Sequence, residues 1–98
     1  DAGRAIYSAS KSALNSYTKS LSKELGSFNI RVNAVSPGLT NTKMIEKGLN
    51  KNILEETIKK IPLKRIAEPE EIANVVLFLA SDMSSYINGE IINVTGGY

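Results

Sequence analysis

Helical periodicity near the start of the chain limits the available folds more than any other feature. From Ser8 to about Leu25, apolar and near-apolar residues recur at helical spacing and continue a stripe that starts at Tyr7 and Lys11. Gly26 follows and suits the C-terminal end of a helix. We therefore predict one long helix that ends at Gly26. Its apolar stripe comprises Tyr7, Lys11, Leu14, Leu21 and Leu25.

Tyr7 and Lys11 lie one helical turn apart on this face. A fixed cation beside a tyrosine favours the phenolate, which makes the tyrosine a usable general acid or base. The alternative for such a pair is an exposed helix contact without chemistry. The rest of the sequence has to decide between the two.

The composition removes several other chemistries. The 98 residues contain no cysteine and no histidine, which excludes disulfides, thiolate catalysis, a histidine base and the usual zinc ligands. We expect no metal site, and acid–base work falls to Tyr, Lys, Asp or Glu. Twelve basic and ten acidic residues are spread along the chain, so we expect neither nucleic acid nor a membrane as a partner. With no signal-like or membrane-spanning run, we expect a cytoplasmic protein.

The remainder alternates strand and helix signals. Residues 29–35 are predicted to form a strand that Ser36, Pro37 and Gly38 end at the C-terminal edge of a sheet, where open α/β sheets bind ligands. Residues 43–61 predict a broken helical segment, with pieces around 44–45 and 53–60. A helix opens at Glu68–Pro69, and its body from Ile72 to Ala80 is apolar on nearly every face, which predicts burial between the sheet and another surface, such as a second subunit. Residues 90–94 close the chain as a strand.

This order predicts an α/β fold in which two parallel neighbouring strands belong to a doubly wound sheet. A single domain is the most that 98 residues allow. Several large apolar side chains would lack partners within such a short piece of sheet. They are Leu14, Leu21, Val32, Val76, Leu77 and Phe78.

Two motifs and a C-terminal signature in a fixed order resemble the short-chain dehydrogenase/reductase family, and within it the bacterial 3-oxoacyl-acyl-carrier-protein reductases. The first is Tyr7-Ser8-Ala9-Ser10-Lys11 with Ser12-Ala13-Leu14, and the second is Ile30-Arg31-Val32-Asn33-Ala34-Val35-Ser36-Pro37-Gly38. The C-terminal signature is Pro62-Leu63-Lys64-Arg65, Pro69-Glu70-Glu71-Ile72-Ala73, Phe78-Leu79-Ala80-Ser81 and Val94-Thr95-Gly96-Gly97. The resemblance covers essentially the whole chain but only the C-terminal part of a typical member.

The resemblance implies that residues 1–98 are a C-terminal fragment of one Rossmann-type domain, with the nucleotide-binding N-terminal half, the glycine-rich loop and the catalytic serine outside it. The parent would transfer hydride between NADP or NAD and a carbonyl or alcohol, with 3-oxoacyl-acyl-carrier-protein reduction in fatty acid biosynthesis as the first expectation. A sugar, steroid or other alcohol dehydrogenase is the alternative within the family. A stand-alone interaction module without activity is the alternative from another class, and we expect the 98 residues alone to be inactive.

By the same resemblance, Tyr7 is the proton donor, and Lys11 supports it and holds the nicotinamide ribose, so both residues are catalytic and cofactor-binding. Pro37, Gly38, Thr40 and Thr42 are implied to bind the nicotinamide end. Thr40 would contact the carboxamide through its backbone, and Thr42 would use its hydroxyl. A polar turn without a ligand is the alternative.

The sequence departs from the family pattern at two positions. Thr40 stands where the family often has Ile or Val, and Lys64 stands where glycine is usual.

The resemblance also implies partners. Tyr17 is expected to be a packing or interface aromatic residue, in a homo-oligomer that is a tetramer in the family. The segment 43–61 is implied to be a substrate lid, and its lysines form either a solvated stripe or a site for a carrier protein's acidic face or phosphopantetheine: Lys43, Lys47 and Lys51.

Overall fold

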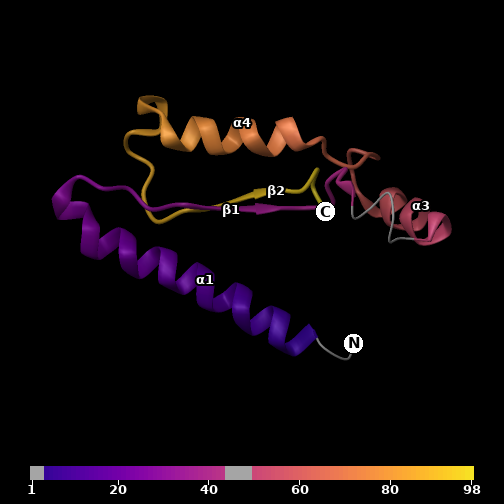
Figure 1. The fold of residues 1–98 in the computed structure, drawn as a ribbon, viewed down its shortest axis with the longest axis horizontal. Coiled ribbons are helices and arrows are strands. Elements are labelled where there is room, and N and C mark those ends of the chain that lie inside the picture. Colours follow the sequence, from indigo (N-terminus) through magenta and orange to yellow (C-terminus); the bar gives the residue numbers. More distant parts are fainter. Residues whose placement is uncertain (1–3, 44–49) are drawn as a thin grey trace. The chain divides into compact units, whose positions relative to one another are not determined.

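The computed structural model describes residues 4–43 and 50–98, and Figure 1 draws its elements. In chain order these are α1 (Arg4–Leu25), the 3₁₀ turn η1 (Gly26–Phe28), β1 (Ala34–Pro37), α3 (Lys51–Lys60), α4 (Pro69–Ala80), the 3₁₀ turn η2 (Asp82–Ser84) and β2 (Ile91–Val94). The chain divides into two compact units. The first comprises Asp1–Ala34 and Ser84–Ile92, and the second Val35–Met83 and Asn93–Tyr98.

Strands β1 and β2 are direct neighbours in a two-stranded sheet (Figure 1). The Ala34 N–H donates to the Glu90 carbonyl at 2.9 Å, and the Gly38 N–H donates to the Val94 carbonyl at 2.8 Å. Both strands advance in the same direction between these two bonds, which is the pattern of a parallel ladder. The predicted parallel pair with a helical crossover is therefore confirmed.

Pro37 was expected to end the strand, yet it is the last residue of β1. Alternate residues of a strand point their N–H groups to the same neighbour. Because Ala34 and Gly38 donate to β2, position 37 would donate toward the opposite edge. The missing N–H of proline thus costs no hydrogen bond with β2.

The first strand begins later than the predicted range of 29–35. Asn29 has a left-handed backbone (φ 60°), and its N–H donates to the Gly26 carbonyl that closes η1. Asn33 then bonds through its side chain, with Nδ2 donating to the Ile87 carbonyl at 3.0 Å. The prediction placed the strand too early because side-chain amide bonds replace the regular ladder here.

The long helix α1 ends before Gly26 as predicted, and its apolar stripe is only partly covered, with Lys11, Leu21 and Leu25 half-buried. Thr18 and Ser22 are buried, whereas Leu14 and Tyr17 are 52% and 63% exposed. The hydroxyls of Thr18 and Ser22 donate to the carbonyls of Leu14 and Lys19, at 2.8 and 2.7 Å. Because the helix itself satisfies these hydroxyls, their burial leaves no polar group without a partner.

Asn88 connects the end of α1 to the segment before β1. Its Nδ2 donates to the Ser22 carbonyl at 3.0 Å, and its Oδ1 accepts from the Val32 N–H at 2.9 Å. Gly89 has φ 78°, and a Cβ added there would lie 2.6 Å from the Ser22 Oγ. A glycine at this position therefore allows the close approach.

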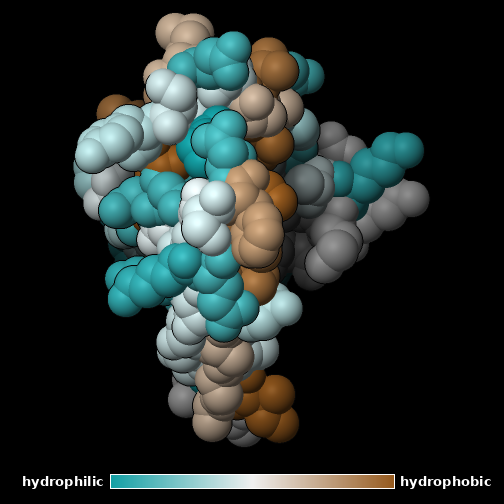
Figure 2. Space-filling view, turned by 90° about the vertical axis from the view of Figure 1, so that its left-hand side faces the viewer, coloured by the Kyte–Doolittle hydropathy of each residue, from teal (hydrophilic) through white to brown (hydrophobic). Residues whose placement is uncertain are grey.

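Helix α4 begins as predicted, and its apolar side chains lack partners within the described residues, as expected for such a short piece of sheet. Glu68 is its N-cap, Pro69 follows, and Glu71 completes a capping box. Val76 and Leu77 are 50% and 68% exposed. Figure 2 likewise shows brown, hydrophobic residues at the surface beside teal, hydrophilic ones. The described residues therefore supply no cover for much of this apolar helix.

The lid segment is only partly described. Helix α3 begins at Lys51, slightly before the predicted piece, because the Asn50 side chain accepts from the Asn52 N–H at 2.9 Å and caps it. The predicted helical piece around 44–45 and Lys47 lie outside the described residues. The lid and the lysine stripe remain predictions.

Candidate functional site

The first group of predicted site residues lies on α1. Tyr7 and Lys11 both fall within the regular helix, so their Cβ atoms are about 5–6 Å apart on one face. Tyr7 is 57% exposed, and Lys11 is half-buried. The Ser10 hydroxyl donates to the Tyr7 carbonyl at 2.8 Å, so that serine serves the helix backbone. Both side chains therefore lie on one face of α1, and their role in proton transfer remains a prediction.

The second group follows β1 in the other unit. Thr42 is exposed and Pro37 ends the strand. A Cβ added to Gly38 would lie 2.9 Å from the Cα of Thr95, so only glycine fits against this backbone without a shift. The structure thus gives Gly38 a packing role, and its contact with a cofactor remains a prediction.

Thr40 lies between two backbone hydrogen bonds that its neighbours make. It forms an isolated parallel bridge with Ala67, in which the Asn41 N–H donates to the Ala67 carbonyl at 2.8 Å and the Ala67 N–H donates to the Leu39 carbonyl at 2.9 Å. These bonds use the residues on either side of Thr40, so its own N–H and carbonyl point the other way. Neither group has a hydrogen-bond partner within residues 4–43 and 50–98.

The hydroxyl of Thr40 is already used. Its Oγ1 donates to the Gly38 carbonyl at 3.0 Å, within the loop itself. An aliphatic residue at this position would lose that one bond and keep the backbone groups. The unpaired N–H and carbonyl fit a carboxamide, which has both an acceptor and a donor.

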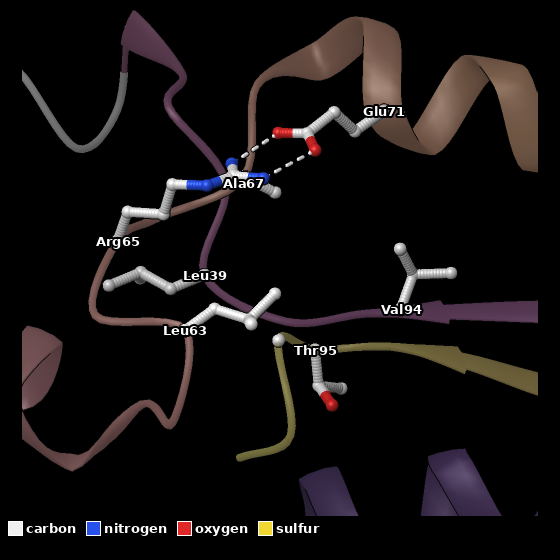
Figure 3. A pocket seen from close by; sticks show the side chains of 8 residues that line it. Leu39, Leu63, Arg65, Ala67, Glu71, Val94 and Thr95 are labelled. Carbon is white, nitrogen blue, oxygen red and sulfur yellow. Dashed lines mark hydrogen bonds and ion pairs between the residues drawn. The ribbon is translucent and has the colours of Figure 1, made fainter.

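An ion pair that the sequence analysis missed lies in the same unit. Arg65 binds Glu71 through two hydrogen bonds of 2.6 and 2.8 Å, drawn as dashed lines in Figure 3. The Glu68 N–H also donates to Glu71, at 3.0 Å. The hydrogen bond from Arg65 is the largest cause, and that from the Glu68 N–H the next, of a Glu71 pKa lowered to about 2. The hydrogen bond to Glu71 in turn raises the pKa of Arg65. The sequence predicted the start of the helix at Glu68 and Pro69 but gave no signal for the pairing of Glu71 with Arg65, which precedes the helix.

A small cavity adjoins this pair. Leu39, Leu63 and Val94 line it together with Arg65 and Glu71 (Figure 3), and its volume is about 100 Å³. Ligand pockets usually measure about 300–1,000 Å³. The cavity is therefore too small for a dinucleotide or an acyl substrate.

The described residues contain neither a cluster of metal-ligating side chains nor a helix that could span a membrane. No group of three or more acidic side chains there is arranged to hold a metal ion. Nor does any helix in those ranges combine the length and apolar character that crossing a membrane requires.

Comparison with known proteins gives consistent relatives. The chain is 57% identical over 90 residues to a 3alpha-hydroxysteroid dehydrogenase of Mediterraneibacter gnavus, covering 92% of this chain and 36% of the relative. It is 50% identical over 95 residues to a 3-oxoacyl-[acyl-carrier-protein] reductase of Chlamydia trachomatis, covering 97% of this chain and 38% of the relative. The chain thus spans well under half the length of these relatives.

A crystal structure of a 3-oxoacyl-[acyl-carrier protein] reductase from Brucella melitensis matches with a TM-score of 0.89 and 42% identity, over 93% of this chain and 34% of that one. This likeness confirms the predicted α/β class with a Rossmann-type parallel sheet. A family model described as enoyl-(acyl carrier protein) reductase matches residues 2–98. With motifs, fold and relatives in agreement, the chain belongs to the short-chain dehydrogenase/reductase family.

Proposed function

We propose that this chain is the C-terminal part of an oxidoreductase that transfers hydride between NADPH or NADH and a carbonyl or alcohol, with 3-oxoacyl thioesters on acyl carrier protein as the substrate. The observation that carries the proposal is the Tyr7–Lys11 pair on one face of α1, in a chain that belongs to a family of reductases. A homo-oligomeric state and a cytoplasmic location belong to the same proposal.

Each of the chain's own residues has a defined task in this reaction. The Tyr7 hydroxyl gives its proton to the carbonyl oxygen, or takes one from the alcohol in the reverse direction. The Lys11 ammonium stabilises the phenolate and binds the ribose hydroxyls. Thr40 meets the carboxamide with its unpaired backbone groups, and Thr42 adds its hydroxyl. The bound nicotinamide supplies or accepts the hydride.

A second candidate is oxidation of a steroid alcohol, favoured by the 57% identity to a hydroxysteroid dehydrogenase. Both candidates need the same proton donor, so Tyr7 and Lys11 cannot separate them. The test is a substrate panel on the full-length protein, with acetoacetyl-acyl carrier protein and 3-hydroxysteroids offered alongside NADPH or NADP. Turnover of the thioester is expected. Turnover of the steroid alone would replace the first proposal with the second.

We further propose that the 98-residue chain does not work alone. The exposed Val76 and Leu77 of α4 leave apolar surface without cover within the described residues. Burying one such side chain contributes about 1.5–3 kcal/mol, so the isolated chain should associate with itself and bind no dinucleotide. Analytical sedimentation of the purified 98 residues tests this. A cooperatively melting monomer that binds NADPH would favour the stand-alone module instead.

A further inference from the structure

We propose that Glu71, paired with Arg65, is a positioning residue that fixes the Thr40 backbone for the nicotinamide end of the cofactor. This inference rests on the proposed function and deepens it. Neither residue touches the cofactor in the proposal. They act through the segment 65–68, called here the strap.

The Glu71 carboxylate fixes both ends of the strap. Its two oxygens bind the Arg65 guanidinium at the start, at 2.6 and 2.8 Å, and one of them accepts from the Glu68 N–H at the end, at 3.0 Å. The two-pronged geometry restricts orientation as well as distance, because a planar guanidinium matches a carboxylate only edge to edge. The strap is therefore held as a short closed loop at the start of α4.

The strap in turn holds the loop after β1. Its Ala67 donates to the Leu39 carbonyl and accepts from the Asn41 N–H, at 2.9 and 2.8 Å. These two bonds, one on each side of Thr40, set the direction of the Thr40 N–H and carbonyl. Neither group has a hydrogen-bond partner among the described residues. A shift of the strap would therefore turn the groups that are proposed to meet the carboxamide.

A weaker contact runs in parallel. The Asn41 Nδ2 lies 3.4 Å from both carboxylate oxygens of Glu68. At this distance the bond is weak, so the bridge at Ala67 remains the main connection. The arrangement makes Glu71 the shared anchor of the helix cap, the ion pair and the loop.

The competing explanation is that Arg65 and Glu71 only stabilise the start of α4, since Glu71 belongs to its capping box. Loss of a cap would lower stability and weaken all ligands alike. Loss of positioning would weaken only ligands that reach the Thr40 backbone. A ligand without nicotinamide separates the two explanations.

The experiment uses the full-length reductase with the variants Glu71→Gln and Arg65→Gln. Glu70→Gln is the matched control, because Glu70 is exposed in the same helical turn and makes no hydrogen bond or ion pair with the strap among the described residues. Dissociation constants are measured for the reduced dinucleotide that the wild type binds and for the matching ADP-ribose, which lacks nicotinamide. Amide hydrogen exchange is measured at Asn41 and Ala67 without any ligand.

Both test variants should bind the dinucleotide about three- to fivefold more weakly, because the pair is solvent-exposed and its effect is modest. ADP-ribose binding should stay within about twofold. Amide exchange at Asn41 and Ala67 should be faster than in the wild type, and the Glu70→Gln protein should match the wild type in every measurement.

Equal weakening of both ligands would overturn the inference in favour of a purely stabilising cap. Faster exchange at Asn41 and Ala67 with unchanged dinucleotide binding would overturn it as well, because the loop would then have moved without consequence. A wild-type protein that binds neither ligand would overturn the proposed function and this inference with it.

Discussion

The two groups of predicted site residues, one in each unit, differ in what is proposed to carry their chemistry. On α1 the proposed reactive groups are side chains, the phenol of Tyr7 and the ammonium of Lys11, and a regular helix sets their spacing. In the loop after β1 the available groups are the backbone N–H and carbonyl of Thr40, while its side chain bonds to Gly38. Substitution of a residue removes its side-chain group directly. A backbone group is instead displaced by changes in the residues that hold the backbone in place.

The largest effect is expected from Tyr7→Phe in the full-length protein. Removing the hydroxyl removes the proton donor, so turnover should fall about 10²–10⁴-fold, while the dissociation constant of the dinucleotide stays within about twofold. Steady-state kinetics and a binding titration measure the two. Tyr17→Phe, an exposed tyrosine of the same helix, should leave turnover unchanged. Activity of Tyr7→Phe within twofold of wild type would show that the helix carries no proton donor.

Lys11→Ala should damage two functions, because one ammonium is proposed to serve both the phenolate and the ribose. Turnover and dinucleotide affinity should each fall by about tenfold or more, as expected for a lost hydrogen bond to a charged group. Lys19→Ala on the same helix is the control. If turnover alone fell and affinity held, the proposed ribose contact would be wrong.

Two variants of Thr40 test whether its backbone, and not its side chain, contacts the dinucleotide. Thr40→Pro removes the N–H and should weaken dinucleotide binding by about tenfold. Thr40→Val keeps the N–H and loses only the bond to Gly38, so its affinity should stay within about twofold. Isothermal titration on both variants, with a thermal melt to check folding, gives the answer. A larger loss for Val than for Pro would place the contact on the side chain instead.

The sequence was informative where a side-chain pattern is sufficient. Periodicity and turn residues predicted α1 and the start of α4, and the spacing of Tyr7 and Lys11 placed both on one helix face. It failed where hydrogen bonds between distant segments decide the structure. Nothing in the pattern shows that Asn33 bonds to the Ile87 carbonyl and delays the strand.

The ion pair shows the same limit. Arg65 and Glu71 are six residues apart, which is not a helix-face spacing, and they meet only because the strap turns between them. Helix α4 agrees with its sequence pattern. Its apolar composition predicted a covering surface beyond this short piece of sheet, and the described residues do not supply that surface.

Backbone geometry also predicts a smaller effect at Lys64, where the family usually has glycine. Lys64 has φ 59°, a left-handed conformation that costs a residue with a Cβ about 1–2 kcal/mol. Lys64→Gly should therefore stabilise the full-length protein by up to about 1 kcal/mol in urea unfolding, after the extra freedom of glycine in the unfolded chain is subtracted. Asn29→Gly, at φ 60°, should gain less because asparagine tolerates this region. An equal gain at both positions would contradict the strain argument.

The smallest effect is a pH dependence that distinguishes the strap from the amide contacts around Asn88. The folded-state pKa of Glu71 is about 2, below its ordinary value of 4.5, so the folded protein binds this proton less readily than the unfolded chain does. The pair's contribution to stability is therefore complete above about pH 4.5 and is lost as the pH falls towards about 2. Arg65 stays protonated throughout this range and does not contribute to the change of the unfolding free energy with pH. In urea unfolding across this window, the stability difference between wild type and Glu71→Gln should shrink on acidification, only slightly because the pair is exposed. The difference between wild type and Asn88→Ala should stay constant, since an amide does not titrate. A Glu71→Gln difference that did not change with pH would mean that the strap owes nothing to the charge of Glu71.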